Sequence, residues 1–229
     1  MLEELKKKVL KANLDLVKNG LVLYTWGNVS QIDRNSGLVV IKPSGVGYDK
    51  MTADDMTVVD LDGNVIEGKY RPSSDTPTHL ELYKTHGGIG GIVHTHSTYA
   101  TAFAQAGKGI DAYGTTHADY FYGQIPCTRN LEQSEMSDYE KNTGKVINEV
   151  FKDKSVSEIP ACLVKNHGVF SWGKDADEAV YLATVLEEVA KMAYLTQCLN
   201  GKAEKLPQYL WDKHYNRKHG KGAYYGQKK

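Results

Sequence analysis

The segment IGGIVHTHS, residues 89–97, carries both the main fold signal and the first chemical signal of this chain. Its apolar first half predicts a short buried strand, and Ser97 is placed to cap the helix that follows. His94 and His96 stand two residues apart, so strand geometry points both imidazoles to one face, about 7 Å apart at the backbone. Such a pair either converges on a metal ion or consists of ordinary polar residues where a strand leaves the core.

A third histidine favours the metal ion. His167 follows the apolar run at 161–166, which we interpret as a strand ending at this residue, and Gly168 permits a sharp turn or a close ligand approach. Three histidines from two strand ends, with one position left open, form the pattern of a catalytic zinc site. Asp75, in a loop before a predicted helix, completes the metal sphere, acts as a base beside it, or only caps the helix.

The remaining histidines carry no assignment from their sequence context. Each fits a surface position or a hydrogen-bonded core position as well as a site. They are His79, His86, His117, His214 and His219.

Length and composition indicate one globular domain over residues 1–229, with 41% hydrophobic and 24% charged residues. Twenty-eight basic and 28 acidic residues cancel, so no overall field attracts nucleic acid or an anionic membrane. No apolar run is long enough to span a bilayer and no signal peptide is recognisable, so we expect a cytoplasmic protein. Cys127, Cys162 and Cys198 are too scattered for a disulfide framework or a thiolate zinc site, which leaves histidine and carboxylate as metal ligands.

Helical and extended patterns alternate along the chain, which predicts a layered α/β/α domain. Apolar spacing and capping residues predict helices over residues 2–16, 76–86, 97–107, 138–153, 175–199 and 206–220. Residues rich in β-branched and aromatic side chains predict strands over residues 21–33, 37–45, 57–61, 64–68, 89–97 and 161–173. Residues 111–126 are too aromatic and too interrupted by glycine to assign.

Three short polar loops, at residues 26–30, 42–45 and 73–74, have the composition of an anion site. A phosphate needs several backbone N–H and hydroxyl donors with a cation nearby, and a helix start adds its positive dipole end. Lys42 is the candidate cation. Each loop by itself is an ordinary turn, so the prediction rests on their joint occurrence.

Two further positions are candidates for proton transfer. Asp119 lies in an aromatic stretch, where poor solvation would raise its pKa toward that of a general acid or base. A buried structural hydrogen-bond acceptor fits the same context. Tyr224 and Tyr225 either belong to an exposed tail or to one that folds over a site and offers a phenolic proton.

Several of these segments form a recognisable set: YTWGNVS, VIKPSGV, PSSDTPTH, GGIVHTHS, GTTHADYFYGQIPCTR, NHGVFSWGK, DKHYNRKHG and AYYGQ. Together they resemble the class II aldolase and epimerase superfamily, and within it the family of bacterial L-ribulose-5-phosphate 4-epimerases. The resemblance implies a single three-layer α/β/α domain with a central, largely antiparallel sheet. It also implies a homotetramer with active sites at the subunit interfaces.

The resemblance assigns roles to particular residues. It implies a divalent metal, zinc or a replacement such as manganese, at Asp75, His94, His96 and His167. It implies Asp119 and Tyr225 as the proton-transfer pair, contributed by the neighbouring subunit. The residues placed around the phosphate of a sugar phosphate, with Lys42 added from its loop, are Gly27, Asn28, Lys42, Ser44, Gly45, Ser73 and Ser74.

The implied reaction inverts C4 of L-ribulose 5-phosphate to give D-xylulose 5-phosphate, a step of L-arabinose catabolism. The C4 hydrogen is not α to the ketone and no G-x-G-x-x-G turn offers a nicotinamide site, so reversible C3–C4 cleavage remains. The related aldolases carry Glu where this chain has Asp75, which favours the epimerase. The alternatives are a sugar-phosphate aldolase and a non-catalytic module of the adducin type, which should lack the three histidines.

Overall fold

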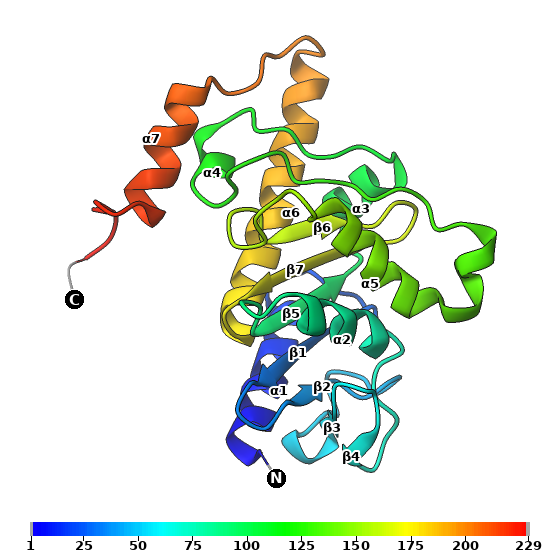
Figure 1. Ribbon diagram of the computed structural model, residues 1–229. Coiled ribbons are helices and arrows are strands. Elements are labelled where there is room, and N and C mark those ends of the chain that lie inside the picture. The colour runs from blue at the N-terminus through cyan, green and yellow to red at the C-terminus, as the bar shows by residue number, and fades with distance from the viewer. Residues whose placement is uncertain (1, 228–229) are drawn as a thin grey trace.

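The computed structural model describes residues 2–227 and contains seven strands, with seven α-helices and two 3₁₀ turns around them (Figure 1). The strands are β1 (Gly27–Asp33), β2 (Leu38–Ile41), β3 (Thr57–Val59), β4 (Val65–Glu67), β5 (Gly91–Thr95), β6 (Ala161–Leu163) and β7 (Val169–Gly173). The helices are α1 (Glu3–Lys18), α2 (Thr76–Thr85), α3 (Thr98–Gln105), α4 (Thr115–Ala118), α5 (Tyr139–Val150), α6 (Ala176–Leu199) and α7 (Gln208–His219). The 3₁₀ turns are η1 (Ala53–Asp55) and η2 (Gln133–Asp138).

The strands form one sheet in the order β4-β3-β2-β1-β5-β7-β6, and every neighbouring pair is antiparallel. β5 lies inside this sheet, between β1 and β7, and all five of its residues are buried. Its register places His94 opposite Asn28 on one side and opposite Phe170 on the other. The central strand therefore brings a metal candidate and an anion-loop candidate side by side.

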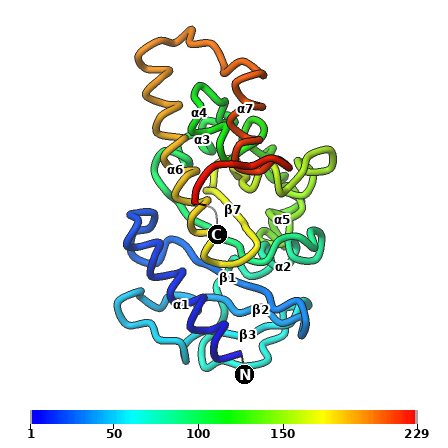
Figure 2. The backbone as a smooth tube through the Cα atoms, turned by 90° about the vertical axis from the view of Figure 1, so that its left-hand side faces the viewer, coloured from blue at the N-terminus to red at the C-terminus, as the bar shows by residue number. Residues whose placement is uncertain are grey.

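Side chains alternate across β5 and separate the core into two clusters. Val93 packs with α1 and the start of α6, whereas Ile92 packs with residues of α2 and α5. Figure 2 shows these helix pairs on opposite sides of the sheet. This three-layer arrangement with an antiparallel sheet confirms the predicted fold class. Within residues 2–227, no helix is long and apolar enough to cross a membrane.

The predicted strand over residues 161–173 is wrong in one respect, because the structure divides it into β6 and β7. Asn166 adopts a left-handed conformation with φ 61°, and the N–H of Val164 donates to the carbonyl of Gly168 at 2.9 Å, which closes a tight hairpin. His167 therefore lies in a turn before a strand and does not end one. This turn places His167 at the edge of the sheet where β5 ends.

Two smaller differences also trace to local geometry. Residues 21–26 were expected to extend the first strand, but Tyr24 has φ 51° and Trp26 N–H donates to the carbonyl of Leu23, so they form a turn. α2 begins at Thr76, so Asp75 and not Thr76 occupies the capping position, although its side chain makes no capping hydrogen bond. The Asp75 carboxylate instead accepts a hydrogen bond from Asn28.

Candidate active site

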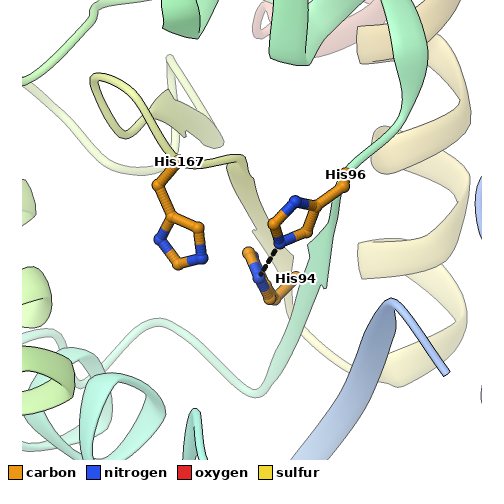
Figure 3. A group of neighbouring side chains, drawn as sticks. All are labelled: His94, His96 and His167. Atoms are coloured by element: carbon orange, nitrogen blue, oxygen red, sulfur yellow. Dashed lines mark hydrogen bonds between the residues drawn. The ribbon is translucent and has the colours of Figure 1, made fainter.

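Three histidines meet where β5 ends and β7 begins (Figure 3). One ring nitrogen from each of His94, His96 and His167 lies within 4.8 Å of the others. The rings are inclined to one another, with centroids 4.9 to 5.0 Å apart. The predicted convergence of the three imidazoles is therefore present.

The surroundings of His94 prepare it to bind a cation. Its Nδ1 lies 3.0 Å from the carbonyl oxygen of Val169, which can only accept, so Nδ1 carries the proton and Nε2 presents a lone pair. Phe170 stacks on the ring at 4.4 Å and holds its plane. Nε2 of His94 faces Nε2 of His96 at 3.2 Å. Two nitrogens directed at one point, with His167 beside them, fit a divalent metal with imidazole ligands.

Gly168 is required for this close approach. A Cβ atom added there would lie 2.7 Å from the carbonyl oxygen of Thr95 and 3.0 Å from Cε1 of His94. Any larger residue would push the two strand ends apart. The glycine therefore permits close packing of the two strand ends, and the close approach of a ligand stays a prediction.

Burial keeps His96 and His167 neutral. It lowers the pKa of His167 to about 4, assisted by His94 and His96. Burial, assisted by His94, also lowers the pKa of His96. Nδ1 of His167 is buried and has no hydrogen-bond partner among the described residues. Neutral imidazoles are the form that binds metal, so the electrostatics agree with the geometry.

Asp75 lies beside the three histidines and outside the group whose nitrogens converge. Asn28 Nδ2 donates to its carboxylate at 2.7 Å and to Ser73 Oγ at 3.1 Å. Burial would raise the pKa of Asp75, but nearby imidazoles, with His94 first, and the Asn28 hydrogen bond lower it below its usual range. An ionised carboxylate therefore stands next to the histidines, and its place in the metal sphere stays a prediction.

Asn28 links this carboxylate to the candidate anion loops. Its Oδ1 is buried without a partner among the described residues and is available to a ligand or a water. Gly27 precedes it, and a Cβ there would lie 2.8 Å from the carbonyl oxygen of His94. This glycine allows β1 to pack against the end of β5.

The other two loops are joined to each other by backbone hydrogen bonds. Ser44 N–H donates to the carbonyl of Arg71 at 2.9 Å, and Ser73 N–H donates to the carbonyl of Lys42 at 3.0 Å. Ser74 is exposed beside them. The structure thus brings the three loops predicted from sequence together next to the histidines, on the side of Asp75.

Lys42 occupies the interior of its loop. The ammonium donates to the carbonyls of Pro43 at 3.2 Å and Val46 at 2.9 Å and lies 5.0 Å from the ring centroid of Tyr48. Gly45, with φ 70°, forms the turn between these carbonyls. Burial lowers the pKa of Lys42 to about 8. Lys42 therefore stabilises its own loop through these two carbonyls, and its direct contact with a phosphate stays a prediction.

The environment of Asp119 corrects the predicted direction of its pKa. Burial acts to raise the pKa, but hydrogen bonds from Arg217 and His214, with the charge of Lys218, lower it below the usual range. Arg217 binds both carboxylate oxygens, with Nε at 2.9 Å and Nη2 at 2.6 Å, and His214 Nδ1 lies 3.1 Å from Oδ1. The sequence suggested an aromatic, poorly solvated site, whereas α7 surrounds the carboxylate with cations.

Tyr225 belongs to the same cluster. Its ring lies over Arg217 at 5.0 Å and over Lys218 at 4.4 Å, the cations that face Asp119. The structure therefore brings the two proton-transfer candidates together. His214, Arg217 and Lys218 were not assigned from sequence, although their spacing of three and four residues on a predicted helix placed them on one face.

The Asp119 cluster and the three histidines lie at opposite ends of the central strands. Tyr120 and His219 line a cavity of about 350 Å³ together with Gly88, which precedes β5, and Gly173, which ends β7. The histidines lie at the other end of both strands, so a five-residue strand of roughly 15 Å separates the two groups. Within one chain the two groups do not form a single site.

Among the remaining histidines, four have structural contacts. His79 is buried, with Nδ1 2.7 Å from Ser30 Oγ, and burial lowers its pKa to about 3. His117 lies 2.9 Å from the carbonyl of Gly123, and His219 lies 2.9 Å from that of Asp119. His86 pairs with an asparagine of α5.

Comparison with known proteins agrees with this geometry. Residues 7–194 match the family described as the class II aldolase and adducin N-terminal domain. Among solved structures, an L-fuculose 1-phosphate aldolase is 27% identical with a TM-score of 0.80, covering 93% of this chain and 95% of that chain. The L-fuculose-1-phosphate aldolase from Thermus thermophilus is 25% identical with a TM-score of 0.69, covering 88% of this chain and 99% of that chain.

A third structure shares the fold at lower identity. YgbL from Klebsiella pneumoniae is 22% identical with a TM-score of 0.74, covering 93% of this chain and 99% of that chain. The family match itself extends over most of the sequence and includes all three histidines and Asp75. The chain therefore belongs to the class II aldolase and adducin N-terminal domain family.

Proposed function

We propose that this protein is a metal-dependent enzyme that interconverts L-ribulose 5-phosphate and D-xylulose 5-phosphate by inverting C4. The observation that carries the proposal is the convergence of one ring nitrogen from each of three histidines within 4.8 Å, beside a short carboxylate, Asp75, that accepts a hydrogen bond from Asn28. A binding module of the adducin type would have no use for this arrangement. The short carboxylate, held away from the converging nitrogens, supports an epimerase in preference to an aldolase with a longer glutamate.

The chemistry requires that the C3–C4 bond break and re-form. The C4 hydrogen is not acidified by the ketone, so direct deprotonation would leave an unstabilised carbanion. Cleavage instead leaves the electron pair on the C1–C3 fragment as an enediolate and gives an aldehyde fragment that carries C4, C5 and the phosphate. Rotation of this aldehyde before the bond re-forms presents its opposite face. A proton must leave the C4 hydroxyl when the bond breaks and return when it re-forms, on either face, which requires two acid–base groups.

The metal proposed at His94, His96 and His167 is zinc, with manganese able to replace it, because imidazole nitrogens in an open three-ligand site suit zinc. Such an ion would act as a Lewis acid on the ketose oxygens. We propose that Asp75 orients this site through its hydrogen bond from Asn28. The loops around Asn28, Ser44 and Ser73 would bind the phosphate of the substrate.

The two acid–base groups would be Asp119 and Tyr225, supplied by a neighbouring subunit. Their position at the far end of β5 and β7 supports this arrangement, because a strand of roughly 15 Å separates them from the histidines of their own chain. A closed ring of identical subunits, proposed here as a homotetramer, would place one chain's α7 at the next chain's metal site. The lowered pKa of Asp119 keeps its carboxylate ionised at neutral pH, which is the form that accepts a proton.

A sugar-phosphate aldolase is the second candidate. The similarity to an L-fuculose 1-phosphate aldolase, at 27% identity over 93% of the chain, favours it. The two activities differ in whether the aldehyde fragment is retained or released. Free aldehyde would identify the lyase.

The test is a coupled assay for D-xylulose 5-phosphate formed from L-ribulose 5-phosphate. The enzyme is stripped with a chelator and reconstituted with zinc or manganese, and released glycolaldehyde phosphate is measured in parallel. Metal-dependent product without free aldehyde is the expected result. Free aldehyde would establish the lyase, and a folded, metal-loaded protein that forms neither product would contradict both proposals.

A further inference from the structure

The C-terminal tail, residues 220–227, folds back over the end of α7 and presents Tyr225. The N–H groups of Tyr224 and Tyr225 both donate to the carbonyl oxygen of Arg217, at 3.0 and 3.1 Å. Tyr225 is nevertheless 62% exposed. A backbone turn with a largely exposed ring leaves the side chain several rotamers, so other contacts must determine its orientation.

Lys218 makes those contacts. Its ammonium nitrogen lies 4.4 Å from the ring centroid of Tyr225 and 3.8 Å from that of Tyr120, so it contacts two aromatic rings. Asp119 Oδ2 lies 3.9 Å away. Only 12% of the Lys218 side chain is exposed, which is unusual for a lysine on an outer helix. An ammonium held against two ring faces is attracted by both quadrupoles.

Tyr120, the second ring that Lys218 contacts, is anchored to α6. Tyr120 follows α4, and its hydroxyl lies 2.5 Å from the hydroxyl of Tyr181 on α6. A continuous chain of contacts therefore runs from Tyr181 through Tyr120 and Lys218 to Tyr225. These four residues lie on α6, after α4, on α7 and in the tail, so the orientation of Tyr225 depends on a tertiary arrangement.

We infer that Lys218 is the positioning residue for Tyr225: its ammonium holds one face of the phenol ring and leaves the hydroxyl free to enter a neighbouring subunit's site. This inference rests on the proposed function, in which Tyr225 transfers a proton. Arg217 also contacts the ring, but it binds both oxygens of Asp119, so changing it would loosen α7 as well. Lys218 lies 3.9 Å from only one oxygen of Asp119, so changing it should disturb the attachment of α7 less.

The chain offers a matched control. Lys213 lies on the same helix, 5.2 Å from the ring centroid of Tyr224, and is exposed. Lys213→Met therefore removes a cation–π contact from the neighbouring tyrosine and leaves Tyr225 untouched. Lys218→Met keeps the aliphatic stem and removes the charge, whereas Lys218→Arg restores a cation.

The kinetic test is a cycle of variants assayed for interconversion of the two pentulose phosphates. Lys218→Met should lower kcat about tenfold with KM and metal content unchanged, as expected for one lost cation–π contact. Lys218→Arg should recover most of the rate, and Lys213→Met should stay within about twofold of the parent. Adding Lys218→Met to Tyr225→Phe should cause no further loss, because a residue that acts only through Tyr225 has no effect without it. Independent, multiplicative losses would overturn the inference.

A second measurement does not depend on activity. Trypsin cleavage after Lys221 releases peptides that begin at Gly222, and mass spectrometry follows their appearance in the intact protein. Lys218→Met should release them faster than Lys213→Met, because only the first detaches the tail. Equal rates in the two variants would overturn the inference even if the protein proved to have another activity. Faster release from Lys218→Met, in a protein that shows no epimerisation, would support the anchoring of the tail by Lys218 and would contradict only the proposed function.

Discussion

The two ends of the central strands are built in different ways. The histidine end is part of the sheet, where every residue of β5 is buried and Phe170 and Gly168 leave His94 little freedom. The opposite end depends on α7, which has no buried residue and attaches through polar contacts such as Trp211 Nε1 to the carbonyl of Phe121 at 2.8 Å. The proposed metal site thus lies on a rigid platform, the histidine end of the sheet, whereas the proposed proton-transfer residues depend on an attached arm, α7 and the tail.

The family match ends close to the boundary between these two parts of the molecule. It covers residues 7–194 and ends within α6, before α7 and the tail. The histidine end therefore lies inside the family match, whereas α7 and the tail lie outside it. Because local openings begin where few apolar contacts are buried, α7 should open at lower free energy than the sheet. Substitutions at the two ends should therefore have different effects.

The largest expected effect is at the platform. His167→Asn should remove metal binding and lower turnover roughly 10³-fold or more, because the metal contributes several kcal/mol to the transition state. Metal content measured after dialysis, together with circular dichroism, tests this prediction. A variant that retained the metal and the rate would show that His167 is not a ligand.

Gly168→Ala should weaken metal affinity about 10–100-fold by displacing the strand ends, an effect typical of residues that orient ligands. The added methyl would lie 2.7 Å from the Thr95 carbonyl. Gly87→Ala is the matched control, since nothing lies within 4 Å of its Cβ position. Equal metal affinity in both variants would contradict the packing argument.

At the arm, Asp119→Asn should speed hydrogen exchange of the α7 amides about tenfold, because charged hydrogen bonds of roughly 1.5 kcal/mol or more are weakened. Amides of β5 should exchange as in the parent protein, and metal content should not change. Glu149→Gln is a control, because Glu149 on α5 makes a comparable two-oxygen contact with Arg129. Faster exchange in β5 as well would mean that the two ends unfold together.

The smallest expected effect concerns pH. Burial lowers the pKa of His117 to about 4, so the folded protein keeps it neutral while the unfolded chain protonates it near 6.5. Its contribution to stability is therefore complete above pH 6.5 and is lost as pH falls toward 4. In metal-free protein, His117→Gln should reduce the pH dependence of the unfolding free energy by about 1 kcal/mol per pH unit in this range. Denaturant unfolding at several pH values measures it, and an unchanged slope would contradict the assigned protonation.

Much of the platform was predictable from sequence because it depends on local periodicity. The spacing of His94 and His96 on a strand required no knowledge of distant residues, and α1, α3, α5, α6 and α7 appear where the apolar spacing placed them. Ser97 occupies the capping position of α3 as predicted, but its hydroxyl has no hydrogen-bond partner among the described residues. A capping box between Thr52 and Asp55 is likewise a contact between residues close in sequence. Residues close in sequence have few conformational alternatives, so their geometry follows from residue type.

The turn at Asn166 and the cations around Asp119 were not predictable in this way. A left-handed residue inside an apolar run has little sequence signal. The partners of Asp119 lie about 100 positions away along the chain, so only docking of α7 determines that its pKa falls instead of rising. The sequence by itself determined which side chains can bind a metal or move a proton. The tertiary structure decided that they occupy opposite ends of the same strands, because packing of distant segments sets distances and charges that local patterns do not encode.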